Sequence, residues 1–272
     1  MLCSLKLLFL RRFLPLLLSF LLLPSICFSD DFEKYLRTFE IITERPPRPA
    51  VGSVASGFGA SNGIVFGAVS YSDKDLQTNL DSDDDGSIVI GMGLGNPGDS
   101  VGVEFAIGIT SVSTGFWGDG KFADEGNFNL KFHKTVAPKL WGKSASFAIG
   151  SSNLTGWGGT LEIPRNNYIV YSEQMLLGEY LQYGIAYTLG YGSAVDNGES
   201  ENGLFGGLSL ARSDYSSSVS FINDEVHFSA TWYMPDVNGL SINYTRADLL
   251  NNNGLVRNII TLGYSFDLGE LL

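Results

Sequence analysis

The sequence predicts an all-β protein, a closed antiparallel up-and-down transmembrane β-barrel of about twelve strands. Three observations support this fold class: an N-terminal secretory signal, a period-two alternation of apolar and small residues, and a regular succession of long and short connections between the alternating stretches. The alternation predicts strands, and the connections predict their order.

Residues 1–29 have the features of a secretory signal peptide. Basic side chains come first, an apolar run extends from Phe13 to Leu23, and the first acidic residue is Asp30. This order predicts export and removal of the segment. An uncleaved membrane anchor is the alternative, although the apolar run is short for a spanning helix.

Removal of this segment changes the charge and the thiol content of the chain. Three of the 17 basic residues and none of the 29 acidic residues lie within it, so the net charge falls from −12 to near −15. Cys3 and Cys27, the only cysteines, also lie there. The secreted chain is therefore predicted to lack disulfides and cysteine metal sites. Its acidic balance argues against nucleic acid as a partner.

Residues 30–50 are predicted to be a periplasmic lead-in, and residues 51–272 are predicted to form the barrel. The lead-in ends in a stretch with three prolines, which lack amide donors and fix φ. In the stretch 101–110, by contrast, the odd positions are Val, Val, Phe, Ile and Ile, and the even positions are Gly, Glu, Ala, Gly and Thr. Such alternation predicts a strand with one apolar face. Strands are expected at 62–72, 87–95, 100–112, 125–134, 138–150, 166–174, 180–191, 203–212, 215–223, 225–233, 238–246 and 256–267.

The connections between these stretches alternate in length. Long polar connections are predicted at 73–86, 113–124, 151–165, 192–202 and 247–255. The others are short, and only the tight turn at Asn223–Asp224 falls where a long one is due. Short periplasmic turns and long external loops are typical of membrane barrels. The first strand is therefore expected to begin, and the last strand to end, on the periplasmic side.

The residues that alternate with the apolar positions are mostly Gly, Ala, Ser and Thr, which suits a crowded lumen better than a water-exposed sheet. Aromatic residues are expected in two bands at the lipid headgroups. The periplasmic band would contain Trp141, Trp232, Tyr233, Tyr264 and Phe266, and the outer band Trp117, Phe128 and Trp157. A soluble β-sandwich or lipocalin-like barrel is the alternative fold.

The signal, the Gly-rich alternating strands and the closing segment Ile260–Phe266 resemble outer-membrane β-barrel proteins of Gram-negative or cyanobacterial-type bacteria. The resemblance implies location in the cell outer membrane, among lipid and lipopolysaccharide. It also implies insertion by the barrel assembly machinery, which reads the alternating aromatics of the last strand. This chain departs from that pattern, because it ends at Leu272, six residues after Phe266.

Five charged or titratable residues are predicted to face the lumen: Glu104, Lys131, His133, His227 and Arg257. Such residues can line a pore and select solutes. Alternatively, Glu104 and Lys131 can pair with each other and help to fill the interior. An enzyme is not predicted, because only two histidines are present and neither belongs to a recognisable Ser/His arrangement.

Asp81, Asp83 and Asp85, followed by Gly86, resemble the opening of a calcium loop. The closing glutamate of such a loop would fall on Met92, which cannot ligate in that way. One interpretation is a solvated acidic loop, and the other is weak Ca²⁺ or Mg²⁺ binding that bridges lipopolysaccharide phosphates. No other cofactor is predicted.

The function predicted from these residues is a narrow, porin-like channel for small solutes. One alternative is a non-conducting barrel that serves envelope structure, surface interaction or polysaccharide export. A second is a soluble secreted binding protein. A lumen filled by side chains, or by an N-terminal plug from residues 31–45, would favour the non-conducting barrel.

Overall fold

The computed structural model of the chain describes residues 49–73, 85–110, 123–137, 144–177, 183–195, 200–252 and 256–270. The predicted signal peptide (residues 1–29), residues 30–48, and the residues Asp81, Asp83, Trp117, Trp141 and Leu272 named above lie outside the described residues. Within the described residues, no helix is long and apolar enough to cross a membrane.

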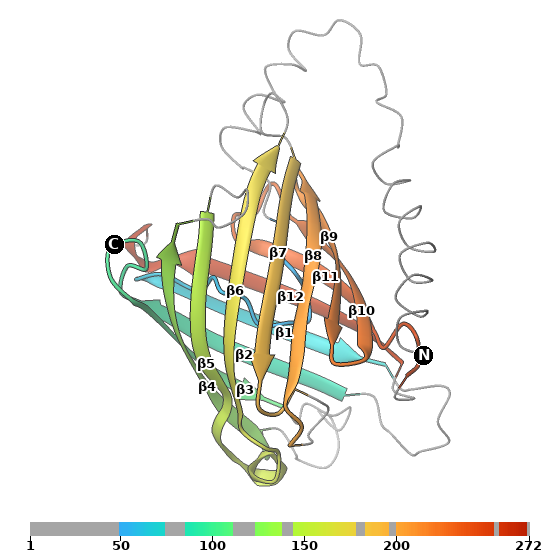
Figure 1. Cartoon of the computed structure of the whole chain (residues 1–272). Helices are drawn as coiled ribbons and strands as arrows, with labels where there is room; N and C mark the ends of the chain where they lie inside the picture. Colours follow the sequence, from blue (N-terminus) through green and yellow to red (C-terminus); the bar gives the residue numbers. More distant parts are fainter. Residues whose placement is uncertain are drawn as a thin grey trace, which may run out of the picture. The chain divides into compact units, whose positions relative to one another are not determined.

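Twelve strands form one closed antiparallel barrel, which confirms the predicted fold class (Figure 1). Each strand pairs with its neighbours in the sequence, and β1 pairs with β12 to close the ring. Closure satisfies the backbone groups that an open sheet would leave unpaired at its edges. The strands are β1 (Ile64–Ser72), β2 (Asp85–Leu94), β3 (Gly102–Ile109), β4 (Gly126–Val136), β5 (Ser144–Trp157), β6 (Asn166–Leu177), β7 (Tyr183–Gly192), β8 (Gly203–Arg212), β9 (Tyr215–Ile222), β10 (Glu225–Tyr233), β11 (Leu240–Ala247) and β12 (Arg257–Asp267).

The barrel has two distinct ends. At one end β1 begins, β12 ends, and the short connections such as Ser213–Asp214 join consecutive strands; we call this the short-turn end. The longer connections lie at the other, long-loop end, together with the predicted tight turn at Asn223–Asp224. The start of β1 and the end of β12 therefore lie at the same end of the barrel, as the alternation of connections predicts.

The largest difference from the prediction concerns β5, which was expected at 138–150. It begins at Ser144 and continues to Trp157, through residues that were predicted to be a loop. The register with β4 shifts at a bulge, where Asn153 has a φ of 51° and its N–H donates to Asn129 Oδ1 at 2.9 Å. An asparagine tolerates this left-handed conformation, so the bulge lets a Ser- and Asn-rich stretch continue as a strand.

Most of the large apolar residues of the strands face outward. Side chains such as Ile90, Ile149 and Leu204 are half or more exposed, whereas inward Ser209 and Ser220 are almost fully buried. A soluble sandwich or lipocalin-like fold would bury the large apolar side chains, because contiguous apolar surface is unfavourable in water. An apolar exterior around a polar interior is the arrangement of a membrane barrel.

Aromatic side chains lie on the outer surface near both ends. Tyr215 and Trp232 stack near the short-turn end, with ring centroids 6.3 Å apart and an interplanar angle of 7°. Phe128 and Trp157 contact each other near the long-loop end, at 5.7 Å. Tyr233, which was predicted for the periplasmic band, lies on the inner-face register instead of facing lipid, because side chains alternate along β10 and Tyr233 follows outward Trp232.

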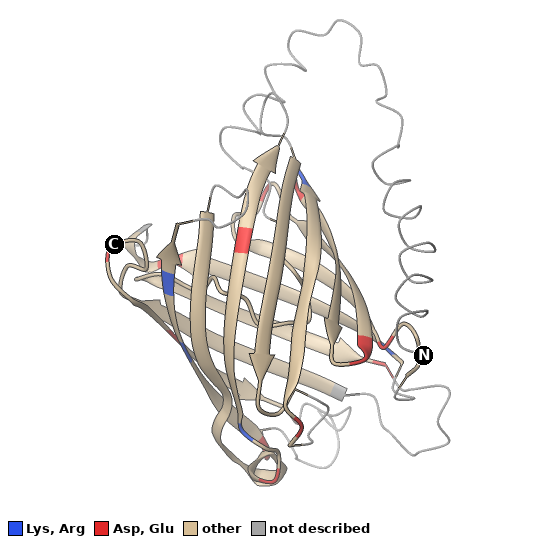
Figure 2. Cartoon of the chain, in the orientation of Figure 1, with Lys and Arg blue, Asp and Glu red and all other residues tan. Residues whose placement is uncertain are grey.

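One carboxyl group lies on the outward register of β6, where Figure 2 shows a single acidic position. Glu173 is only 1% exposed, and its Oε2 accepts hydrogen bonds from the hydroxyls of Tyr171, at 2.7 Å, and Tyr187, at 2.8 Å. Buried polar groups are costly unless they are hydrogen-bonded, so these tyrosines make the outward carboxyl group tolerable.

We expect Tyr187→Phe to lower the free energy of unfolding by about 1 to 3 kcal/mol, because it removes one donor to this buried carboxyl group. Urea unfolding in detergent or lipid micelles measures the loss. Tyr183→Phe is the matched control: Tyr183 lies on the same face of β7 and stacks on Arg212, 5.5 Å from its ring centroid. Equal losses in the two variants would contradict the assigned role of the Tyr187 hydroxyl.

Candidate functional site

The lumen is not empty, because residues 49–62, which precede β1, run through it; we call them the crossing segment. Figure 1 shows this part of the chain in blue, inside the ring of strands. At one wall, Gly52 N donates to Ser218 Oγ of β9 at 2.9 Å. Ser53 Oγ lies 3.4 Å from Ser229 Oγ of the neighbouring strand, β10. Both serines of the wall belong to the inward face and are buried.

The middle of the crossing segment packs against β5, β6 and β8. Val54 and Ala55 contact an apolar cluster that consists of Ala148, Val170 and Phe205. This buried apolar cluster lies in a lumen that is lined mainly by small and polar residues, and it packs against the apolar residues of the segment.

Close backbone contact follows at Gly57. Its N–H donates to Ser172 Oγ at 2.8 Å, and a Cβ added there would overlap the backbone oxygen of Ser146. Glycine is the residue that permits such an approach. The segment therefore lies against the wall at this point with no room for a side chain.

The far wall holds the segment by three side chains, Glu104, Lys131 and His133, which we call the clamp. Glu104 and Lys131 pair directly across β3 and β4, with Oε1 and Nζ 2.9 Å apart. Ala60 N donates to Glu104 Oε2 at 2.8 Å, and Lys131 Nζ donates to the carbonyl of Phe58 at 2.9 Å. His133 Nε2 lies 3.1 Å from the carbonyl oxygen of Ala60. Each clamp residue thus binds the backbone of the crossing segment.

The contacts lie on opposite sides of the barrel. Strands β9 and β10 hold one part of the segment, and β3 and β4 hold the other. In a ring of twelve strands, β9 faces β3 and β10 faces β4. The crossing segment therefore spans the diameter of the lumen.

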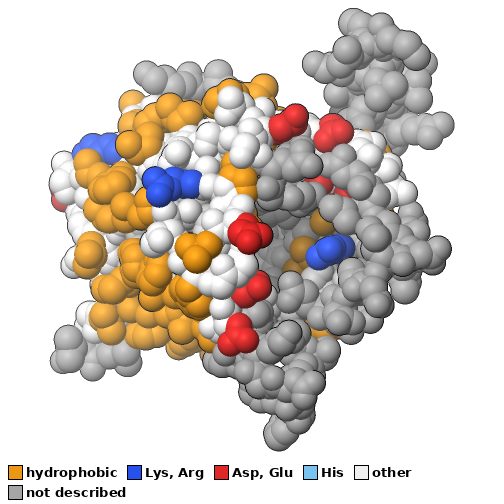
Figure 3. Space-filling view, turned by 90° about the horizontal axis from the view of Figure 1, so that it is seen from below, with side chains coloured by type: hydrophobic (Ala, Val, Ile, Leu, Met, Phe, Trp, Pro, Cys, Tyr) orange, Lys and Arg blue, Asp and Glu red, His pale blue; other side chains and the backbone are white. Residues whose placement is uncertain are grey.

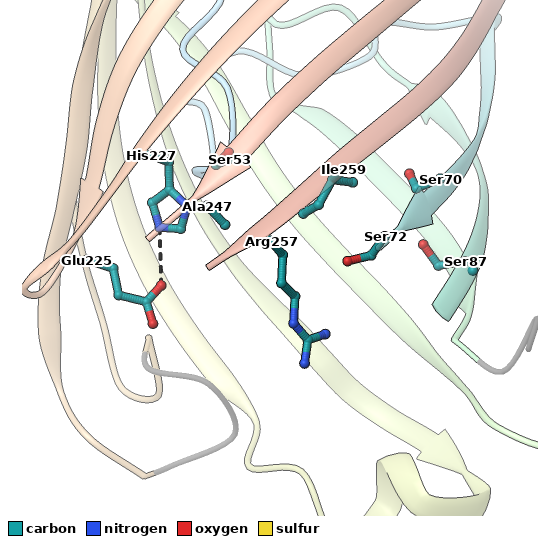
Figure 4. A pocket seen from close by; sticks show the side chains of 10 residues that line it. Ser53, Ser70, Ser72, Ser87, Glu225, His227, Ala247, Arg257 and Ile259 are labelled. Carbon is teal, nitrogen blue, oxygen red and sulfur yellow. Dashed lines mark ion pairs between the residues drawn. The ribbon is translucent and has the colours of Figure 1, made fainter. Parts of the chain in front are cut away.

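A cavity of about 570 Å³ lies on the long-loop side of the crossing segment, with Ser53 in its lining. The ends of β1, β2, β10, β11 and β12 surround it (Figure 4). Figure 3 shows the molecule from the side on which β5 and β6 are joined: a hollow contains a basic side chain, and acidic side chains border it. Residues that line the cavity include Ser72, Ser87, Glu225, His227 and Arg257.

The five residues predicted to face the lumen lie on its inner face, in two separate groups. Three of them form the clamp, so the pairing of Glu104 with Lys131 also binds the crossing segment. The other two, His227 and Arg257, line the cavity. The predicted acidic site is described only at Asp85, whose backbone is the first residue of β2. Its side chain, Asp81 and Asp83 are not among the described parts of the chain.

Sequence reasoning missed the crossing segment. Residues 51–63 were assigned to the barrel and 31–45 were considered as a plug, whereas the segment that lies in the lumen is 49–62. A signal was present in the sequence, because residues 52–63 consist mostly of Gly, Ala and Ser, the residues of the inward face. Glu225 was also missed, although it shares the inward parity of His227 on β10.

No protein-family model matches the chain, and no curated protein matches it. Several solved structures resemble it, including the following three. The KdgM porin in complex with disordered oligogalacturonate has a TM-score of 0.49 and 7% identity, over 75% of this chain and 99% of that chain. An outer-membrane channel from Pseudomonas putida F1 has a TM-score of 0.45 and 13% identity, over 79% and 100%. The outer membrane protein Omp33 of Acinetobacter baumannii has a TM-score of 0.41 and 10% identity, over 75% and 96%. Because these TM-scores lie below 0.5, the functional assignment rests on the chain's own residues.

Proposed function

We propose that the protein is an outer-membrane channel for small polar solutes, whose lumen is restricted by the crossing segment. The observation that supports this function most strongly is the cavity at the long-loop end, which lies inside a closed barrel with an apolar exterior. Hydroxyl-bearing side chains on the inward face can replace part of the hydration of a passing solute. The crossing segment then limits the size of what passes.

Planar-bilayer recording of the purified protein tests the proposal. We expect discrete conductance steps, smaller than those of the double variant Glu104→Ala/Lys131→Ala, which removes the side chains of the clamp that bind the crossing segment and is called the released variant. Migration in detergent gels with and without boiling reports whether each sample contains a folded barrel. The absence of steps from folded wild-type protein and from the folded released variant would contradict a channel function.

A second candidate is a non-conducting barrel that serves envelope structure or surface interaction. The anchoring of the crossing segment at two opposite walls favours it, because a firmly held segment can block transport. The two candidates differ in one result: the folded wild-type protein conducts measurably if it is a channel and does not conduct if it is a non-conducting barrel.

The proposed setting is the cell outer membrane, with the long-loop end outside, surrounded by lipid and lipopolysaccharide, after insertion by the barrel assembly machinery. Weak divalent-cation binding by Asp81, Asp83 and Asp85 stays a prediction. Transport rather than catalysis is proposed because of the contacts of the histidines: His133 binds the Ala60 carbonyl, and His227 lies beside Glu225. Neither contact is the Ser–His pair that a hydrolase would need.

A further inference from the structure

The cavity at the long-loop end contains a cation, Arg257, for which the described residues supply no ion-pair partner. Arg257 is the first residue of β12 and pairs with Ala247 on the inner face of β11. Figure 4 shows its side chain extending into the cavity. In the described part of the chain, the guanidinium of Arg257 forms neither an ion pair nor a hydrogen bond. Its guanidinium has five N–H donors in a planar fork, a geometry that fits a carboxylate.

A second polar group in the same cavity lacks hydrogen bonds. His227 is only 5% exposed, and neither of its ring nitrogens has a hydrogen-bond partner within the described residues. Its Nε2 lies 3.3 Å from Glu225 Oε2, which is ion-pair distance, while Nδ1 has no such neighbour. Buried polar groups are nearly always satisfied, and exceptions require a specific explanation. A bound solute would supply the missing partner.

Hydroxyl groups complete the lining. Ser72 and Ser87, on the ends of β1 and β2, lie on the other side of Arg257 from His227 in Figure 4. The volume of about 570 Å³ lies within the range of ligand sites, about 300 to 1,000 Å³. Ser53 of the crossing segment belongs to the lining, so a solute that enters from the long-loop side would meet this cavity before it reaches the clamp.

From this combination we infer that the cavity is a binding site for a small hydroxylated carboxylate. The carboxylate pairs with the guanidinium of Arg257, and the hydroxyls of the solute bind His227 and the serines. Glu225 Oε2 lies 3.3 Å from His227 Nε2, and the guanidinium of Arg257 is the charged group that extends into the cavity toward a solute. The inference deepens the proposed channel function, on which it rests, by naming the class of solute.

Ligand-observed NMR titration of the full secreted chain in detergent micelles tests the site. The probe is potassium gluconate, and the matched control is glucitol, which has the same carbon chain and no charge. We expect saturable binding of gluconate and at least about tenfold weaker binding of glucitol, since the charge-assisted bidentate contact is lost.

The variant Arg257→Gln should weaken gluconate binding about tenfold or more and leave glucitol binding unchanged. Arg246→Gln is the matched control, because Arg246 lies at the same end on the outer face and donates to Asn258 Oδ1 at 3.2 Å. Equal binding of the two probes, or unchanged gluconate binding by Arg257→Gln, would overturn the inference.

Bilayer recordings distinguish failure of the site from failure of the channel. Gluconate binding without conductance would refute the channel and retain the site. Conductance without gluconate binding would refute the site alone.

Discussion

Replacing Glu104 and Lys131 together by alanine is expected to raise the single-channel conductance several-fold. The double variant removes the acceptor of the Ala60 N–H and the donor to the Phe58 carbonyl, and it leaves no unpaired charge in the wall. Two hydrogen bonds to charged groups together contribute about 3 kcal/mol, which corresponds to a shift of about a hundredfold in the equilibrium between the crossing and the released segment.

The control for this variant removes the same two charges outside the lumen. Glu162 is exposed in the connection after β5, and Lys134 lies on the outward register of β4. The double variant Glu162→Ala/Lys134→Ala should conduct like the wild type. If the clamp variant also conducts like the wild type while it folds into a barrel, the clamp does not hold the segment in the conducting path.

Gly57→Ala is the second change with a large expected effect. The added Cβ would overlap the backbone oxygen of Ser146, and backbone atoms of a barrel wall cannot yield as a flexible side chain can. The segment must then move away from β5 and β6 and lose the hydrogen bond from Gly57 N to Ser172 Oγ. We expect a higher conductance, measured in planar bilayers, with every charge of the lumen unchanged.

Gly67→Ala serves as the control for this steric change. Gly67 lies on the outward register of β1, where an added Cβ would be 3.4 Å from its nearest neighbour, the carbonyl oxygen of Val89. That is an ordinary contact, so this variant should keep the wild-type conductance. A Gly57→Ala variant that also keeps it would show that the segment does not lie against this wall in the membrane.

The period-two alternation predicted the barrel because lipid and lumen impose opposite demands on successive residues. Val101 to Thr110 shows this alternation throughout, and β3 lies where it was expected. The inward positions of Glu104, Lys131 and Arg257 follow from the same parity. Alternation fails where the backbone leaves the regular strand, as at Asn153, because a bulge changes the parity without a composition that reveals it.

Contacts between distant segments could not be predicted from local pattern. Residues 52–63 have no periodicity, and their position depends on serines that are 115 or more residues away, such as Ser172 and Ser218. The pairing of Glu104 with Lys131 was one of two interpretations of the sequence. What the sequence did not reveal is that the same two side chains bind the backbone of the crossing segment.

A reversible cross-link tests most directly whether the crossing segment restricts the lumen. Ser53 Oγ and Ser229 Oγ are 3.4 Å apart, so cysteines at these two positions are well placed to form a disulfide. Cys3 and Cys27 precede Asp30, so removal of the predicted signal peptide would leave these introduced cysteines as the only thiols. The pair is introduced into the Glu104→Ala/Lys131→Ala variant, and its conductance is recorded before and after reduction. We predict wild-type conductance while the disulfide is intact and a several-fold rise when a reductant is added. A cross-linked sample that already conducts like the reduced one would contradict the account.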